Sequence, residues 1–140
     1  MPSKARAEQL VLAANSSRLA TVSLRPHVIW GDGDPHLVPG LRARTRCGRL
    51  LLPGTGANHV DTVHVCDAAE AHVLAVEKLT PDSPLAGAGY FLTQGRPCSL
   101  ATTVRGLLAR HGITAEIRSV PAHAARAAAV LLEAAAKALP

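Results

Sequence analysis

The fold class is decided by two stretches near the start of the chain, PSKARAEQLVLAAN (residues 2–15) and LATVSLRP (residues 19–26). Apolar residues recur at helical spacing in the first stretch and predict a helix over residues 3–16. In the second, residues 19–24 favour a strand, which Pro26 ends because proline has no N–H to donate to a neighbouring strand. Helices that alternate with short strands are typical of layered α/β folds.

The same alternation continues outward from this start. Glycine and proline residues mark residues 27–39 as a turn-rich loop. Asp67 is expected to cap a later helix, with Glu70 placed for a capping box. The other expected elements are helices over residues 37–47, 67–79 and 99–112 and from Pro121 onward, and strands over residues 50–52, 60–65, 90–93 and 115–120, the first two of these as a strand pair. The sequence therefore predicts an α/β fold, taken as a single partial domain over residues 1–140.

The net charge of +5 comes almost entirely from arginine and raises the question of nucleic-acid binding. The cations are spread along the chain, and one cluster stands out: Arg42, Arg44, Arg46 and Arg49. No aromatic residue lies near this cluster to stack on bases, as single-strand binders require. We interpret the cluster as a solvated helix face and expect no nucleic-acid partner, with a phosphate site as the alternative.

The three cysteines, Cys47, Cys66 and Cys98, are widely spaced and form neither a Cys-x-x-Cys pair nor a zinc pattern. Reduced thiols in a cytoplasmic protein are the simplest expectation. The start of the chain shows no signal-peptide pattern. The longest apolar run, residues 127–132, is too short to span a bilayer, so no transmembrane segment is expected.

Four motifs follow one another along the chain: PSKARAEQLVLAAN at 2–15, LRPHVIWGDGDPH at 24–36, GTGANHVD at 54–61 and GYFLT at 89–93. In order and spacing, over about residues 1–120, they resemble the 3β-hydroxysteroid dehydrogenase/isomerase family of extended short-chain dehydrogenases. The resemblance implies a Rossmann-type enzyme that uses NAD or NADP. It also implies that this chain is the C-terminal, substrate-side portion, without the N-terminal βαβ units.

The first motif carries a catalytic position of that family, in which a tyrosine and a lysine sit four residues apart on one helix. The tyrosine is the acid/base, and the lysine holds the nicotinamide ribose and lowers the pKa of the tyrosine. Lys4 matches the lysine by its Ser-Lys-Ala context. The matching tyrosine would fall one position before Met1, so the chain is expected to lack it. The alternative is that Lys4 is an ordinary exposed lysine.

The second motif carries the other expected contacts. By resemblance, Pro26 ends a strand, and backbone groups at His27 and Val28 meet the nicotinamide carboxamide, beyond the strand's carboxyl end. Trp30 and His36 would border a pocket for an apolar substrate. The alternatives are that Pro26 only terminates a strand and that Trp30 is a core residue.

Histidine and aspartate are frequent enough in the second and third motifs to raise the question of a metal. The residues concerned are His27, Asp32, Asp34, His36, His59, Asp61 and His64. Their spacing fits no zinc motif, so no metal is expected, and Asp61 is taken as a structural hydrogen-bonding residue.

The family's dinucleotide site rests on a Gly-x-x-Gly-x-x-Gly turn that places a helix N-terminus at the pyrophosphate. Neither Gly31-x-Gly33 nor Gly54-x-Gly56 has the third glycine of that turn. The 140 residues are therefore expected to be inactive by themselves, since both the tyrosine and the pyrophosphate site are missing from them.

Two functions remain open from the sequence. The first is hydride transfer between NAD(P) and a hydroxyl or keto group of a steroid-like or other bulky apolar substrate, to which this chain contributes a part. The second is a non-catalytic remnant or interaction module, which would self-associate through the exposed edge of the strand at residues 19–24.

Overall fold

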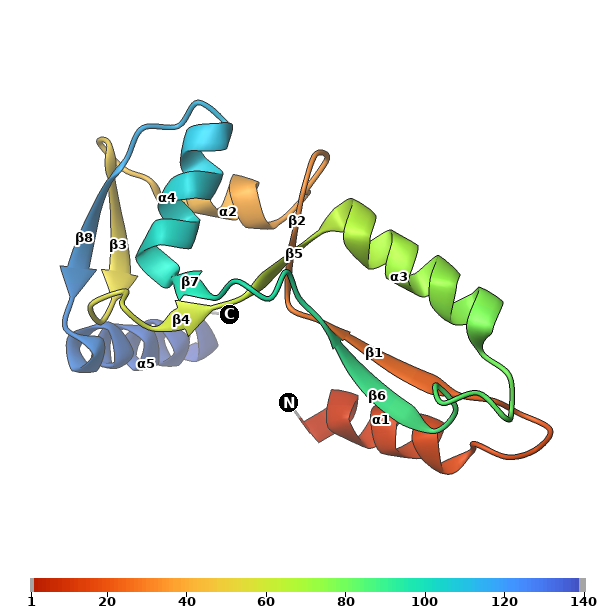
Figure 1. Ribbon diagram of the computed structural model, residues 1–140. Helices are drawn as coiled ribbons and strands as arrows, with labels where there is room; N and C mark the ends of the chain where they lie inside the picture. The colour runs from red at the N-terminus through yellow and green to blue at the C-terminus, as the bar shows by residue number, and fades with distance from the viewer. Residues whose placement is uncertain (1, 139–140) are drawn as a thin grey trace. The chain divides into compact units, whose positions relative to one another are not determined.

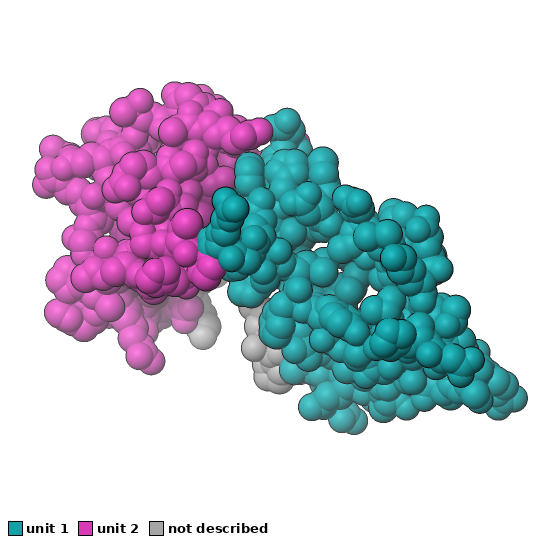
Figure 2. All heavy atoms as spheres, viewed as in Figure 1, with its two compact units in different colours: residues 1–32, 61–96 teal, residues 33–60, 97–140 magenta. Residues whose placement is uncertain are grey.

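The computed structural model describes residues 2–138, and the chain groups into two compact units. Unit 1 comprises residues 1–32 and 61–96, and unit 2 comprises residues 33–60 and 97–140 (Figure 2). Each unit is therefore built from two separate stretches of chain. The single partial domain over residues 1–140 stays a prediction.

Unit 1 is an α/β arrangement in which strands pair in parallel. Its elements are α1 (Pro2–Ala13), β1 (Val22–Pro26), β2 (Val28–Trp30), β5 (Thr62–His64), α3 (Val65–Lys78) and β6 (Ala88–Leu92) (Figure 1). β1 pairs with β6, and β2 pairs with β5. Helices α1 and α3 both pack against β1, which gives the strand a helix neighbour on either side in Figure 1.

Unit 2 has two strand pairs and three helices among its described residues. Its elements are α2 (Leu37–Arg44), β3 (Arg49–Pro53), β4 (His59–Val60), β7 (Cys98–Ser99), α4 (Leu100–Arg110), β8 (Glu116–Val120) and α5 (Ala122–Ala138). β3 and β8 pair in parallel, whereas β4 and β7 are antiparallel. Ser99 caps α4, and its hydroxyl accepts the N–H of Thr102 at 3.2 Å, near the start of the helix expected over residues 99–112.

The buried apolar side chains are divided unevenly. In unit 2, α2, β3 and α4 contribute Val38, Leu41, Leu50, Leu52, Val104, Leu107 and Leu108. In unit 1, the buried apolar residues of the described chain are Val63, Ala68 and Ala75. Unit 2 therefore has a leucine-rich core, while unit 1 has a thin one.

The strand predictions need correction in three places. Residues 27–39 are not only loop, because β2 forms there. The strand expected at 60–65 is divided into β4 and β5 at Asp61, whose carboxylate accepts the N–H of Thr62 at 2.8 Å. The strands expected at 50–52 and 60–65 are not partners, since β3 pairs with β8 and β5 with β2.

The N-terminal end of α3 also differs from the prediction. The helix begins at Val65, so Asp67 lies inside its first turn. His64 is the capping residue, and its Nδ1 accepts the N–H of Cys66 at 3.3 Å. Histidine is not among the residue types that sequence rules favour as helix caps.

Within residues 2–138, no helix is both long and apolar enough to cross a membrane.

Candidate cofactor-side site

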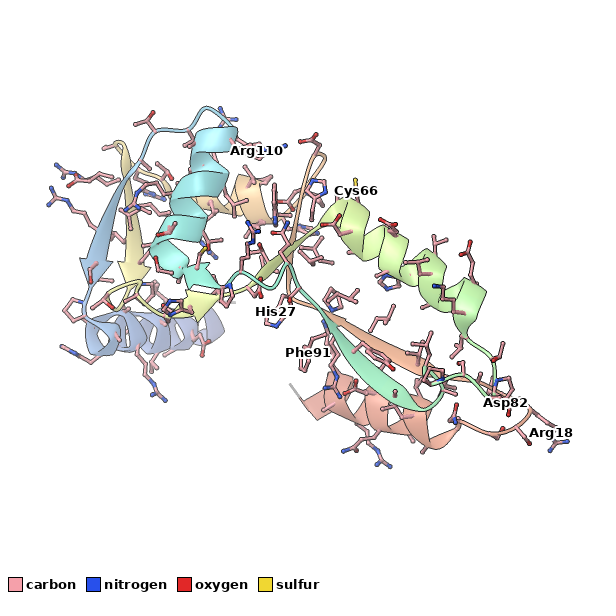
Figure 3. All side chains as sticks on the ribbon, viewed as in Figure 1. Arg18, His27, Cys66, Asp82, Phe91 and Arg110 are labelled. Carbon is pink, nitrogen blue, oxygen red and sulfur yellow. The ribbon has the colours of Figure 1, made fainter. Side chains whose placement is uncertain are left out.

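Of the predicted site residues of unit 1, Pro26 and His27 lie at the carboxyl ends of β1 and β6. The parallel register places Pro26 opposite Leu92, so both strands end at the same edge. His27 and Phe91 lie at this end of the strand pair, and Arg18 and Asp82 lie at the other (Figure 3). Ligands of open α/β sheets bind beyond such an edge.

The N-terminal end of α1, the helix that carries Lys4, lies toward this edge because α1 runs antiparallel to β1 (Figure 1). Near the end of α1, Asn15 Oδ1 accepts the N–H of Thr21 at 2.9 Å, just before β1. One turn after Lys4, Glu8 accepts from Arg25 Nε at 2.7 Å, at the end of β1. The helix therefore directs its first turn past Arg25. The Lys4 side chain is exposed, and its ammonium makes no ion pair with a described residue.

A polar cluster that the sequence reading did not identify lies between α1 and the β1–β6 pair. Glu8 accepts hydrogen bonds from Arg25 Nε and from the Ser23 hydroxyl. The guanidinium of Arg25 stacks over the Phe91 ring, 5.0 Å from its centroid. The hydrogen bond from Arg25, and then that from Ser23, lowers the pKa of Glu8, and the bond to Glu8 raises the pKa of Arg25. Two sequence features could have indicated this cluster: Glu8 lies one helical turn after Lys4, and Arg25 lies directly before Pro26.

His27 is the first residue beyond β1, and it extends the strand's hydrogen bonding where Pro26 cannot. Its backbone N–H donates to Leu92 O at 3.0 Å. One backbone group assigned to the nicotinamide carboxamide is therefore already used within the sheet. The His27 ring is exposed and lies 5.8 Å from the ring of Phe91, centroid to centroid. Val28 follows at once as the first, exposed residue of β2.

Trp30 is held by its neighbours at the end of β2. Its ring meets His64 edge-on with 4.9 Å between centroids. Next to it, Gly31 is buried, and a Cβ at this position would come within 2.4 Å of Val65 Cγ1. The glycine is thus needed for the close approach of β2 to the start of α3. Trp30 is half-buried there, which combines a packing role with a partly open indole face.

His36 belongs to unit 2 and is described there by itself. It is exposed and sits at the first turn of α2, where its side chain makes no capping hydrogen bond. Asp34 does the capping: it accepts the N–H groups of His36 and Leu37 at 3.0 Å and of Val38 at 2.7 Å. These bonds, that from His36 first, lower the pKa of Asp34.

The glycine pairs offer no phosphate cradle in the described chain. The carbonyls of Gly56 and Asn58 accept the first two amides of α4, from Ala101 and Leu100. The starts of α2 and α3 are likewise satisfied by Asp34 and His64. Residues 2–138 also contain no group of three histidine, cysteine, aspartate or glutamate side chains placed to share a metal.

Comparisons of the sequence with known proteins assign the chain to a family. The model of the 3-beta hydroxysteroid dehydrogenase/isomerase family matches residues 1–121. The chain is 53% identical over 109 residues to 2-alkyl-3-oxoalkanoate reductase of Stenotrophomonas maltophilia, covering 78% of this chain and 33% of the relative. It is 36% identical over 104 residues to human sterol-4-alpha-carboxylate 3-dehydrogenase, decarboxylating, covering 72% and 28%. The chain thus spans about a third of the length of these curated relatives.

Solved structures confirm the α/β fold at lower identity. RMD of Pseudomonas aeruginosa, solved with NADPH, matches with a TM-score of 0.63 and 22% identity, over 86% of this chain and 42% of that one. A dTDP-glucose 4,6-dehydratase of Bacillus anthracis, solved with NAD, matches with a TM-score of 0.62 and 23% identity, over 86% and 39%. With a family match over residues 1–121, the chain belongs to the 3-beta hydroxysteroid dehydrogenase/isomerase family.

Proposed function

We propose that this chain forms the nicotinamide-side and substrate-side part of an NAD(P)-dependent oxidoreductase. The observation that carries the proposal is the position of Lys4, in its Ser-Lys-Ala context, on the helix that begins beside the carboxyl edge of β1. An ammonium without an ion-pair partner at that edge is suited to hold the hydroxyls of a ribose. The bound NAD(P) would supply or accept the hydride.

The residues that follow β1 have the second role. Pro26 ends the ladder, and backbone groups of His27 and Val28 other than the His27 N–H orient the nicotinamide carboxamide. The charge of Lys4 favours the ionised form of a tyrosine acid/base four residues before it in the family pattern. In these roles, the chain's residues bind and orient the cofactor and tune a proton transfer.

The substrate is a hydroxy or keto compound with bulky apolar substituents. The two relatives named above are a reductase of a 2-alkyl-3-oxoalkanoate and a 3-dehydrogenase of a sterol-4-alpha-carboxylate, so each acts at position 3 of a molecule that carries a carboxylate. The half-buried Trp30 contributes apolar surface to such a molecule, and a role of His36 toward the substrate stays a prediction. We place the chain in the cytoplasm, a compartment in which exposed thiols such as those of its three cysteines stay reduced.

The share of the enzyme present here sets the expected activity. Residues 1–140 lack the family's Gly-x-x-Gly-x-x-Gly turn and, within the matched helix, the tyrosine. We therefore expect no NAD(P)-dependent turnover from the purified 140-residue chain with a 3β-hydroxysteroid or a 2-alkyl-3-oxoalkanoate. Measurable turnover would contradict the expectation that these 140 residues lack the pyrophosphate site and the acid/base.

A chimaera tests the positive half of the proposal. Residues 1–121, the range of the family match, replace the corresponding segment of the Stenotrophomonas 2-alkyl-3-oxoalkanoate reductase, which retains its own remaining sequence. We expect NAD(P)H-dependent ketone reduction, followed by the loss of reduced-cofactor absorbance. A folded chimaera that binds NAD(P)H but reduces no ketone, or that no longer binds the cofactor, would contradict the proposal.

One observation favours the interaction module as a second candidate. Among the described strands, β1 is hydrogen-bonded to β6 alone, and an unpaired strand edge recruits other chains. Under this alternative the chain self-associates through β1. Light scattering over a range of protein concentrations separates the two: a monomer that melts cooperatively counts against self-association.

A further inference from the structure

We propose that Glu8 and Arg25 are a positioning pair that keeps the Lys4 ammonium free and holds α1 against the end of β1. The inference rests on the proposed function, in which Lys4 binds the cofactor ribose. It concerns residues that make no direct contact with substrate or cofactor in that scheme.

The first step is the helical spacing. Lys4 and Glu8 stand four residues apart on α1, so their side chains share one face of the helix. A lysine and a glutamate at this spacing attract one another on a helix surface. Without a competing partner, Glu8 would therefore draw the Lys4 ammonium back onto its own helix and away from a ligand.

The second step is the competing partner. Arg25 Nε lies 2.7 Å from Glu8 Oε1, and the Ser23 hydroxyl donates to the same oxygen. Both donors come from β1, and the Glu8 side chain is 25% exposed, so it is held at the helix–strand contact. A charge-assisted bond from a planar guanidinium is stronger and more directional than one from an ammonium. Arg25 and Ser23 therefore outcompete Lys4 for this carboxylate.

The third step is the support of Arg25 itself. Ser23 and Arg25 register opposite Gly89 and Phe91 on β6, so the four positions share one face of the strand pair. The guanidinium stacks on Phe91 at 5.0 Å, and a Cβ on Gly89 would come within 3.2 Å of Arg25 Nη2. The absence of a side chain at Gly89 leaves room for the guanidinium. Because Arg25 directly precedes Pro26, fixing Arg25 also fixes the start of the Pro26–Val28 segment.

The test measures the acylation rate of Lys4 in the full chain without any cofactor, by mass spectrometry, relative to Lys78. Arg25→Met releases Glu8, so the Lys4 rate relative to Lys78 should fall about 1.5- to 2-fold, and Ser23→Ala added to it should deepen the fall. Arg25→Lys should stay close to wild type, since it still pairs with Glu8. Arg6→Met is the matched control, because it removes a cation from α1 that makes no ion pair with Glu8.

Two further conditions separate the ion pair from a general loss of structure. Adding Glu8→Gln to Arg25→Met should restore the wild-type ratio, and so should about 1 M salt, where the screening length is about 3 Å. An unchanged ratio in Arg25→Met, or a fall that persists in the Glu8→Gln/Arg25→Met double variant, would overturn the proposal. The acylation assay contains no cofactor. A chimaera that fails to bind NAD(P)H would therefore contradict the proposed function, while the Lys4 to Lys78 ratio could still be interpreted.

Discussion

The two units reach a comparable layered arrangement by different means. Unit 2 buries leucine and valine side chains from α2, β3 and α4, and Leu50 and Leu108 are only 1% and 2% exposed. Unit 1 buries Val63 and two alanines, and it joins α1 to β1 through polar contacts from Glu8 and Asn15. The unit that carries the candidate site is thus the one with less hydrophobic stabilisation.

Exposed apolar side chains sharpen this contrast. On α3, Val73 and Val76 are 56% and 80% exposed, and Leu10 on α1 is 56% exposed. Parallel strand pairs normally lie in larger sheets with both faces covered. A thin core and helices with exposed apolar side chains indicate that unit 1 depends on specific polar contacts for its geometry. Its single tryptophan, Trp30, provides a fluorescence signal for this unit alone.

The largest expected effect is the loss of core volume in unit 2. Leu50→Ala should lower the free energy of unfolding by about 2–5 kcal/mol, because a fully buried leucine leaves a cavity. Leu51→Ala is the matched control one residue along β3, since Leu51 is 58% exposed. Urea denaturation followed by circular dichroism measures both. Equal losses in the two variants would show that β3 does not have the inward and outward faces described.

The next effect tests the close approach in unit 1. Gly31→Ala should destabilise the chain by about 1–3 kcal/mol, because its Cβ would meet Val65 Cγ1 at 2.4 Å. Gly106→Ala, in α4, should instead stabilise by about 0.5–1 kcal/mol, since nothing lies within 4 Å of its Cβ and the residue is helical. Trp30 fluorescence should report the first change. A neutral Gly31→Ala would contradict the packing of β2 on α3.

A smaller loss is expected from the cap of α2. Asp34→Ala should cost about 1 kcal/mol, because three backbone N–H groups lose their acceptor. Asp34→Asn keeps an acceptor oxygen and should cost only a fraction of that. The comparison of the two variants by thermal melting isolates capping from charge. Equal costs would assign the effect to the carboxylate charge instead.

The smallest effect is a pH dependence. The folded-state pKa of Glu8 lies below its ordinary value of 4.5, so its contribution is present above that pH and is lost as pH falls through the folded value. The Trp30-reported unfolding midpoint should therefore decline below about pH 4.5, and less steeply in Glu8→Gln. If the unfolding midpoint fell equally at acid pH in the wild type and in Glu8→Gln, the Glu8–Arg25 ion pair would not be the cause of the pH dependence.

Much of the fold was predictable because its signals are local. Helices α1 and α4 follow from apolar spacing, whereas α3 was expected from a cap at Asp67, a role that His64 has in the structure. Short strands were harder, since β2, β4 and β7 have two or three residues each and no periodicity to recognise. The pairing of β3 with β8 joins segments far apart in sequence, so no local pattern predicts it.

Site residues that belong to a sequence motif could be predicted. Those that are brought together only by the folded structure could not. Lys4 and Pro26 came from motif context, and the structure places both toward one edge of unit 1. The Glu8–Arg25 contact joins a helix to a strand, and its two residues are unremarkable in isolation. The roles of His27, Val28, Trp30 and His36 toward ligands stay predictions.

The proposed role of Lys4 in binding the ribose of the cofactor is tested most directly in the chimaera described above. Lys4→Met should lower kcat at least about 100-fold, because it removes the group that positions the ribose and assists the proton transfer. Lys78→Met removes an equal charge from the far end of α3 and should leave kcat within about twofold. A Lys4→Met chimaera that keeps the kcat of its parent would contradict the account.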